Sequence, residues 1–230
     1  MPAVTLPVML FAAGFGTRMG QLTANRPKPM IEVAGKPLID HALDQVTTYG
    51  ADRIVVNLHY LPDQIERHLA GRGILMSLEN PVILETGGGL RAALPILGAG
   101  PVFTMNTDAV WRGPNPLCHL AAQWHPETMD ALLLCIPKSR AVGHDGTGDF
   151  VISDDGQATR GPGAIYSGLQ IIKTDRLQDI DESAFSLNLL WDRILAEGRL
   201  FAVTYPGKWC DVGHPEGIAL AEAVLGTSDV

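Results

Sequence analysis

Short apolar runs alternate with stretches of helical periodicity along the first part of the chain. The runs that predict buried strands lie at 8–12, 53–58, 74–78, 101–106 and 130–136. Apolar residues three or four positions apart predict helices between them, at 38–46, 62–69, 90–97 and 117–124. Repeated strand–helix units predict an α/β fold with a doubly wound, mainly parallel sheet and right-handed crossovers.

The pattern changes after Pro137. Asp154-Asp155-Gly156 predicts a tight turn after a short strand at 149–152, and therefore a hairpin. Further elements are predicted as a strand at 164–172, a helix at 188–196, a strand at 200–204 and a helix at 215–225. We expect one domain over residues 1–230, with a small β-rich, lid-like insertion at about 138–170 that binds a ligand.

Composition narrows the function. A hydrophobic content of 46% predicts a substantial core, and a net charge of −8 without a basic stripe argues against nucleic acid as a partner. No apolar run reaches the roughly 20 residues that span a bilayer, and the N-terminus lacks the cationic segment of a signal peptide. Because the three cysteines are widely spaced, we expect reduced thiols in a cytoplasmic protein.

The clearest local motif follows the first strand: Ala12-Ala13-Gly14-Phe15-Gly16-Thr17-Arg18. Small residues and glycines let the backbone approach a ligand, so that its N–H groups can point at phosphate oxygens. Arg18 adds a cation with several donors, suited to a polyphosphate. The segment therefore predicts a phosphate-binding loop.

Two other phosphate-loop classes do not fit. The spacing of a P-loop, which ends in Gly-Lys-Ser/Thr, is absent. Gly14, Gly16 and Gly20 give one residue too many for a dinucleotide-binding loop, and the second strand does not end in the acidic residue of that class. A hydride-transferring dinucleotide enzyme is accordingly the weakest alternative.

Three further motifs suit a polyphosphate. Pro27 and Pro29 flank Lys28, and we expect them to hold it in an extended segment at a fixed place. Asp108 follows the strand at 101–106, at the edge of a parallel sheet where ligands bind. Its carboxylate suits Mg²⁺. The three consecutive glycines of 87–89 predict a close approach of ligand and backbone.

Residues 11–39 resemble the nucleotidyltransferase family that makes nucleotide sugars. The resemblance rests on its A-A-G-x-G-T-R-M loop, followed by P-K-P-M and G-K-P-L-I. It implies that Arg18, Lys28 and Asp108 are catalytic, with Arg18 on the triphosphate and Lys28 near the reacting phosphorus. The implied nucleotide contacts are Ala12, Ala13, Gly14, Gly16, Thr17, Arg18, Lys28, Glu85, Thr86, Gly88 and Asn106.

The same resemblance supplies a metal site and a sugar site. It implies that Asp211, in W-C-D-V-G, joins Asp108 in holding Mg²⁺. Thr107 departs from the family's N-G-D motif, and we expect it to crowd the metal or to tighten the choice of sugar. The implied sugar contacts are Asn106, Asp149, Ser167 and Gly168, whereas His144 is expected to be an exposed loop residue.

The implied partners are a nucleoside triphosphate and a sugar 1-phosphate, joined with release of pyrophosphate. The L-E-T-G-G-G segment resembles N-acetylmuramate-1-phosphate uridylyltransferases of cell-wall sugar recycling, which favours UTP. A mannose-1-phosphate guanylyltransferase, another nucleotide-sugar pyrophosphorylase and a non-catalytic nucleotide or sugar-phosphate sensor stay open. We expect a catalytic domain alone, without the C-terminal β-helix of bifunctional relatives; the pattern does not fix the oligomeric state.

Overall fold

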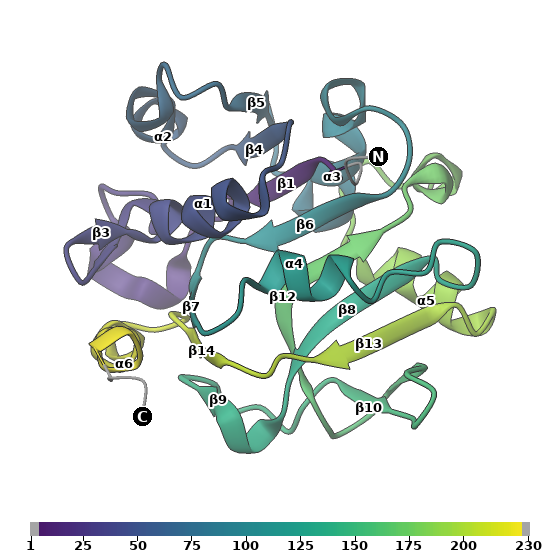
Figure 1. Ribbon diagram of the computed structural model, residues 1–230. Helices are drawn as coiled ribbons and strands as arrows, with labels where there is room; N and C mark the ends of the chain where they lie inside the picture. The colour runs from purple at the N-terminus through teal and green to yellow at the C-terminus, as the bar shows by residue number, and fades with distance from the viewer. Residues whose placement is uncertain (1–4, 227–230) are drawn as a thin grey trace.

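A twisted seven-stranded sheet runs through the centre of the computed structural model, which describes residues 5–226 (Figure 1). Its strands come from the most apolar segments of the chain, whose backbone groups must pair when buried. They are β1 (Val8–Phe11), β4 (Ile54–Leu58), β5 (Leu75–Leu78), β6 (Val102–Asn106), β8 (Ala131–Ile136), β12 (Ile165–Ile172) and β13 (Leu200–Thr204).

The sheet has the order β13-β8-β12-β6-β1-β4-β5, and only β12 runs antiparallel to its neighbours. From β1 the chain winds outward through β4 and β5, and then crosses to the other side of β1 to form β6. The winding therefore reverses between β1 and β6, and ligands bind at such a switch point. The predicted mainly parallel, doubly wound sheet is confirmed.

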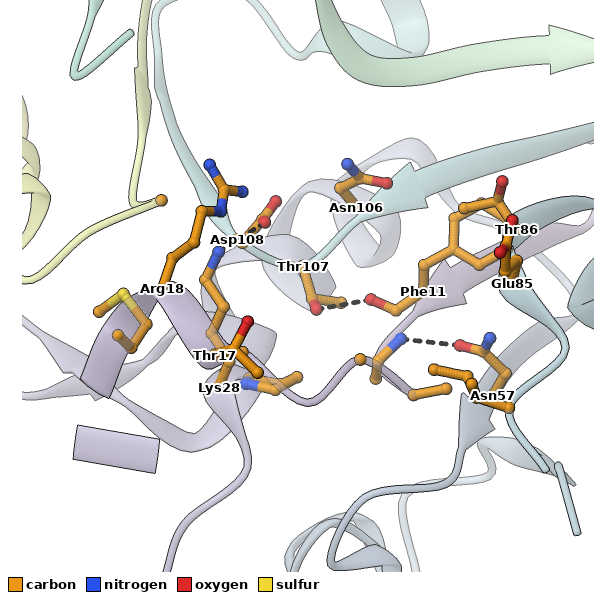
Figure 2. A pocket seen from close by; sticks show the side chains of 18 of the residues that line it. Phe11, Thr17, Arg18, Lys28, Asn57, Glu85, Thr86, Asn106, Thr107 and Asp108 are labelled. Atoms are coloured by element: carbon orange, nitrogen blue, oxygen red, sulfur yellow. Dashed lines mark hydrogen bonds and ion pairs between the residues drawn. The ribbon is translucent and has the colours of Figure 1, made fainter. Parts of the chain in front are cut away.

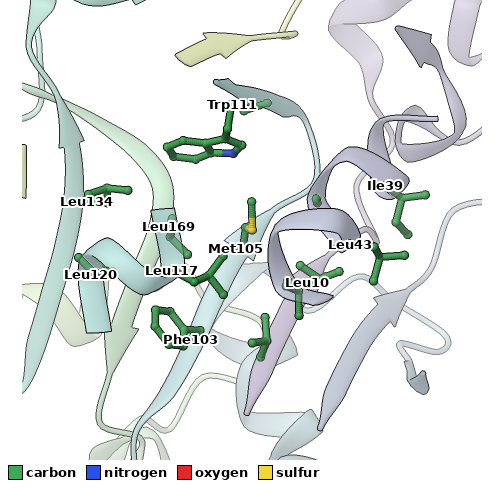
Figure 3. Packing of buried hydrophobic residues seen from close by; sticks show 14 of the residues in the cluster. Leu10, Ile39, Leu43, Phe103, Met105, Trp111, Leu117, Leu120, Leu134 and Leu169 are labelled. Carbon is green, nitrogen blue, oxygen red and sulfur yellow. The ribbon is translucent and has the colours of Figure 1, made fainter. Parts of the chain in front are cut away.

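Helices cover both faces of the sheet because successive strand side chains point in opposite directions. Leu10 packs with the helices α1 (Leu38–Tyr49), α2 (Pro62–Leu69) and α4 (Pro116–Ala121), as Figure 3 shows in part. Its neighbour Met9 packs on the opposite face with α3 (Glu85–Leu97) and α5 (Asn188–Ala196). Two apolar layers thus fix the carboxyl edge of the sheet in place.

A small second sheet was not predicted. It consists of β7 (Ala109–Arg112), β14 (Lys208–Asp211) and β9 (Ala141–Val142), with β14 in the centre. α6 (Glu216–Gly226) packs on β7 and β14. This sheet is important because it joins the end of the chain to the segment that follows β6.

The predicted hairpin is confirmed as β10 (Phe150–Ile152) and β11 (Ala158–Arg160), which pair antiparallel. The predicted β-rich insertion is not one unit, however. β9 belongs to the small sheet, and β12 lies inside the central sheet between β6 and β8. The apolar residues of β12 are buried on both faces, as a central strand requires.

Short elements complete the fold: a two-stranded ribbon of β2 (Glu32–Val33) and β3 (Lys36–Pro37), and 3₁₀ turns at Thr17–Thr23, Lys28–Met30, Lys138–Arg140 and Asp175–Asp179. Cys118, Cys135 and Cys210 are free thiols, as predicted. None of the helices between residues 5 and 226 is apolar over a length that would span a bilayer.

Candidate functional site

A first cleft of about 300 Å³ opens at the switch point, between the loop after β1, the start of α3 and the segment after β6. Most of the predicted nucleotide contacts line it. They are Ala12, Ala13, Gly14, Gly16, Thr17, Arg18, Lys28, Glu85, Thr86 and Asn106, together with Asp108. Figure 2 shows Arg18, Lys28 and Asp108 at one end of this cleft, and Glu85 and Thr86 at the other.

The loop after β1 holds its shape through glycine. Gly16 has a φ of 64°, and an added Cβ there would lie 2.8 Å from Cβ of Lys28. Thr23 fastens the same turn by donating from Oγ1 to the carbonyl oxygens of Gly16 and Gly20. A side chain at position 16 would therefore push Lys28 out of place.

Lys28 lies against the loop at Gly16 and forms an ion pair with Asp108. Its Nζ is 2.7 Å from Oδ2 of Asp108, and its side chain is only 11% exposed. The predicted extended conformation is wrong at Lys28 itself, which begins a 3₁₀ turn with Pro29. Pro27 alone is extended, and the turn aims the ammonium group at the carboxylate.

Asp211 reaches the same place although it lies more than a hundred positions along the chain. β14 pairs with β7 so that Asp211 is opposite Ala109, and the N–H of Val212 donates to the carbonyl oxygen of Asp108 at 2.8 Å. A Cβ on Gly213 would lie 3.0 Å from Oδ2 of Asp211 and 3.1 Å from Nη1 of Arg18. The small sheet thus brings both aspartates beside the phosphate loop.

The electrostatics of this cluster favour a bound cation. Burial raises the pKa of Asp211, and the negative charge of Asp108 raises it further. The charges of Lys28 and Arg18, and that of His144, oppose the rise only in part. Two carboxylates that repel each other, close to a phosphate loop, suit a hard divalent ion such as Mg²⁺.

The protein itself supplies only part of a coordination shell. Within residues 5–226, no three histidine, cysteine, aspartate or glutamate side chains group closely enough to hold a metal. Mg²⁺ commonly takes one or two carboxylates and completes its shell with substrate phosphates and water. The donor set of Asp108 and Asp211 therefore fits an ion that arrives with a triphosphate.

Thr107 does not crowd this cluster, which was the first of its two predicted effects; the second, a tighter choice of sugar, stays a prediction. Its side chain is buried, and Oγ1 donates to the carbonyl oxygen of Phe11 at 2.7 Å (Figure 2). The hydroxyl thus connects the ends of β1 and β6 on either side of the switch point. A glycine at this position would lack that connection.

The three consecutive glycines let α3 pack closely against its neighbours inside the protein. They lie inside α3, where a Cβ on Gly87 would lie 2.3 Å from the ring of Phe185 and one on Gly88 would lie 2.6 Å from the carbonyl oxygen of Ser183. Gly88 is not among the residues that line the two clefts, and its contact with the nucleotide stays a prediction. Glu85 and Thr86, just before the glycines, do line the first cleft.

Asn57 and Glu79 line the first cleft but were missing from the predicted site. Asn57 accepts from the N–H of Ala12 and donates to Oε1 of Glu79, both at 2.7 Å. The other oxygen of Glu79 accepts from the N–H of Leu84 at 2.7 Å. This chain connects the phosphate loop to the start of α3. The sequence could have indicated Asn57, which is a polar residue near the end of an apolar strand. No sequence pattern indicated Glu79.

A second cleft of about 290 Å³ adjoins the first and shares Phe11, Thr86 and Asn106 as walls. Its other lining residues are Asp149, Phe150, Arg160, Tyr166, Ser186, Leu187, Asn188 and Trp191. Asp149, a predicted sugar contact, accepts through Oδ2 from the N–H of Tyr166 at 2.8 Å. The predicted roles of Asp149 and Asn106 therefore suit their positions.

Ser167 and Gly168 are not among the residues that line the two clefts, and their contacts with the sugar stay predictions. Ser167 is buried in β12 and donates from Oγ to the carbonyl oxygen of Leu134. Gly168 has a φ of 84° at an irregularity of the strand, and a Cβ there would lie 2.8 Å from Cγ of Asn106. Gly168 thus gives Asn106 the room to reach both clefts.

His144 is more enclosed than predicted. Its side chain is 28% exposed, with Nδ1 3.9 Å from Oδ2 of Asp211, and its ring lies against Trp209. Sequence reasoning missed this because the loop that carries His144 follows β9, which pairs with β14 beside Asp211.

The doubly wound sheet with a phosphate loop after its first strand has the fold of nucleotidyltransferases. The structure of HddC from Yersinia pseudotuberculosis complexed with GMP-PN superposes with a TM-score of 0.77, covering 96% of this chain and 100% of HddC. At 22% identity that similarity shows the fold alone. Residues 8–145 match the MobA-like NTP transferase domain, and the chain belongs to that family of enzymes.

Two relatives are similar over almost their whole length, and both are named N-acetylmuramate alpha-1-phosphate uridylyltransferase. The one from Caulobacter vibrioides is 41% identical, covering 94% of this chain and 96% of its own. The one from Neisseria meningitidis serogroup B is 32% identical, covering 96% and 99%. A mannose-1-phosphate guanyltransferase from Gibberella zeae is 27% identical over 90% of this chain but only 61% of its own.

Proposed function

We propose that this protein transfers a uridylyl group from UTP to N-acetylmuramate 1-phosphate and releases pyrophosphate. The observation that carries the proposal is the convergence of Asp108 and Asp211 beside Lys28 and Arg18. The choice of substrates rests on the two relatives of that name, which align over nearly the whole chain. The product is a nucleotide sugar, which suits the recycling of cell-wall sugars in the cytoplasm.

In the proposed reaction, an oxygen of the sugar phosphate attacks the α-phosphorus of UTP, and the bond from that phosphorus to the bridging oxygen of pyrophosphate breaks. The attacking phosphate is already anionic near neutral pH, so the step needs positioning and charge neutralisation more than a base. Asp108 and Asp211 hold Mg²⁺, which when bound neutralises charge on the reacting phosphates. Arg18 binds the leaving pyrophosphate, and Lys28 offsets charge at the α-phosphorus.

The ion pair of Lys28 with Asp108 suits this role. In the ligand-free protein each side chain neutralises the other while both are largely buried, which avoids an unpaired charge. With a triphosphate and its metal bound, Asp108 would be a ligand of the metal and the ammonium group of Lys28 would be free to donate to a phosphate oxygen. The two clefts share Asn106 as a wall, which supports a nucleotide in the first cleft and a sugar phosphate beside it in the second.

A second candidate is guanylyl transfer from GTP to mannose 1-phosphate, which several relatives of lower identity are named for. Both candidates share the phosphate chemistry and differ in base and sugar. The discriminating experiment is a pyrophosphate-release screen of four nucleoside triphosphates against muramate, glucosamine, glucose and mannose 1-phosphates. Turnover with UTP and N-acetylmuramate 1-phosphate supports the proposal, whereas turnover only with GTP and mannose 1-phosphate refutes it.

A further inference from the structure

A guanidinium group lies on the wall of the second cleft. Among the described residues that line this cleft, Arg160 alone carries a positive charge. Nη2 of Arg160 donates to Oδ1 of Asn188 at 2.7 Å and to Oδ1 of Asp192 at 3.0 Å. These bonds join β11 to the first turns of α5.

Aromatic rings fix the position of this group. The guanidinium carbon of Arg160 lies 5.1 Å from the ring centre of Phe150 and 5.4 Å from that of Trp191. Trp191 is held in turn by a 2.8 Å hydrogen bond from its indole nitrogen to Gln170. A cation stacked on rings that cannot turn is preorganised to bind an anion.

Part of the guanidinium still has hydrogen-bonding capacity. Within the described part of the chain, neither Nε nor Nη1 of Arg160 has a hydrogen-bond acceptor. The ion pair with Asp192 is exposed, with 41% and 60% of the two side chains accessible, so solvent screens it. Arg160 can therefore offer two donors and much of its charge to a ligand in the cleft.

We infer that Arg160 recognises a carboxylate on the sugar and thereby selects an acidic sugar 1-phosphate. The inference rests on the proposed function and deepens it. N-acetylmuramate differs from N-acetylglucosamine by a lactyl ether, whose carboxylate is ionised at neutral pH. Arginine binds such a group through two parallel hydrogen bonds.

The rest of the second cleft agrees with this orientation. Asp149 is the acidic residue among those that line this cleft. Its carboxylate repels another carboxylate but can accept hydrogen bonds from sugar hydroxyls. The lactyl group is therefore directed away from Asp149 and toward Arg160. The ring of Trp191 packs edge-on against those of Phe150 and Tyr166, and this buried aromatic cluster backs the wall that carries Arg160.

The test is the ratio of kcat/KM for N-acetylmuramate 1-phosphate to that for N-acetylglucosamine 1-phosphate, with saturating UTP. For Arg160→Gln we expect this ratio to fall about tenfold to a hundredfold, the usual effect of losing hydrogen bonds to a charged group. Arg160→Lys keeps the charge but loses the paired donors, so an intermediate fall is expected. The amide of the lactyl group should behave as N-acetylglucosamine 1-phosphate does.

Asp192→Asn is the matched control, because it weakens the junction between β11 and α5 but leaves Arg160 in place. We expect it to keep the substrate ratio within about twofold. If Arg160→Gln or Arg160→Lys lowers kcat/KM for both sugars by the same factor, Arg160 is only a structural link and the inference is wrong. If the wild-type enzyme itself prefers a neutral sugar, the proposed substrate is wrong as well, so the two failures are distinguishable.

Discussion

Nζ of Lys28 donates a hydrogen bond of 2.7 Å to Oδ2 of Asp108, across a cleft whose two walls come from segments 80 positions apart. The pair joins the turn after the phosphate loop to the segment after β6. Each partner is the counter-ion of the other until a substrate brings charges of its own. Both residues therefore have to exchange partners for the proposed reaction to occur.

Replacing Lys28 by methionine should lower kcat by about a hundredfold or more, because one preorganised cation at a reacting phosphate is removed. Steady-state pyrophosphate release measures this effect. Lys36→Met is the control, because Lys36 forms an exposed ion pair with Asp44 and does not line either cleft. A Lys28→Met enzyme as fast as the Lys36→Met enzyme would remove Lys28 from the mechanism.

Asp211→Asn should make the metal-free protein more stable. Burial and the charge of Asp108 raise the pKa of Asp211, so the folded state binds a proton more tightly than the unfolded chain does. Stability therefore falls as the pH rises from 3.8 toward the raised pKa, and the loss persists at neutral pH. Without divalent ions at pH 7, Tm should rise by about 2 °C in differential scanning calorimetry.

Asp130→Asn should change Tm in the opposite direction to Asp211→Asn. Although burial acts to raise its pKa, hydrogen bonds from Arg199 and Lys173 outweigh burial and hold the pKa below 3.8. That stability is present at neutral pH and is lost as the pH falls through the lowered pKa, so this variant should lower Tm at pH 7. Equal changes in the two variants would contradict the electrostatic account of Asp211.

Substitutions at two glycines should show separate effects, one on the stability of the protein and the other on the binding of UTP. Gly87→Ala places a Cβ 2.3 Å from the ring of Phe185, and overpacking of this kind costs about 1–3 kcal/mol in the free energy of unfolding. The Cβ added by Gly14→Ala has no atom within 4 Å. Because Gly14 lines the first cleft, the added methyl group reduces the room for a ligand there. This variant should keep Tm and raise KM for UTP.

Urea unfolding and UTP kinetics on both variants check this prediction. The result that contradicts it is a Gly14→Ala protein that loses stability, or a Gly87→Ala protein as stable as the wild type. The first would mean that the loop at Gly14 has no room for a methyl group, and the second that the packing of α3 on Phe185 can adjust to one.

Thr107→Val should disturb the switch point without changing the size of the side chain. The variant leaves the carbonyl oxygen of Phe11 without its 2.7 Å donor, and a buried acceptor without a partner costs about 1–3 kcal/mol. Thermal unfolding measures the loss, and Thr107→Ser, which keeps the hydroxyl, is the control. Equal Tm values for the two variants would show that the hydroxyl contributes nothing.

The local motifs could be predicted from the sequence because the residues that give each motif its chemistry are adjacent in the chain. The phosphate loop after β1 and the aspartate after β6 follow from strands that end at one edge of a parallel sheet. The residues of those two segments that were predicted to contact the nucleotide line the first cleft. The partnership of Asp211 with Asp108 came from family resemblance and not from spacing.

What could not be predicted depends on tertiary packing. The close packing at Gly87 in α3 depends on Phe185, which lies almost a hundred positions away in the sequence. The sequence did not show that β12 lies inside the central sheet, where the hydroxyl of Ser167 donates to the carbonyl oxygen of Leu134. Arg160 carried no motif, and only the fold shows that it stacks on Trp191 in a cleft.

The central claim is that Asp108 and Asp211 hold one Mg²⁺ ion together. The direct measurement is the rate of pyrophosphate release from UTP and N-acetylmuramate 1-phosphate, as a function of Mg²⁺ concentration, in Asp108→Asn, Asp211→Asn and the double variant. Each single variant should lose at least about a hundredfold in kcat, and the double variant little more, since residues acting as a unit are not additive. If either single variant keeps wild-type turnover at every Mg²⁺ concentration, the shared metal site is wrong.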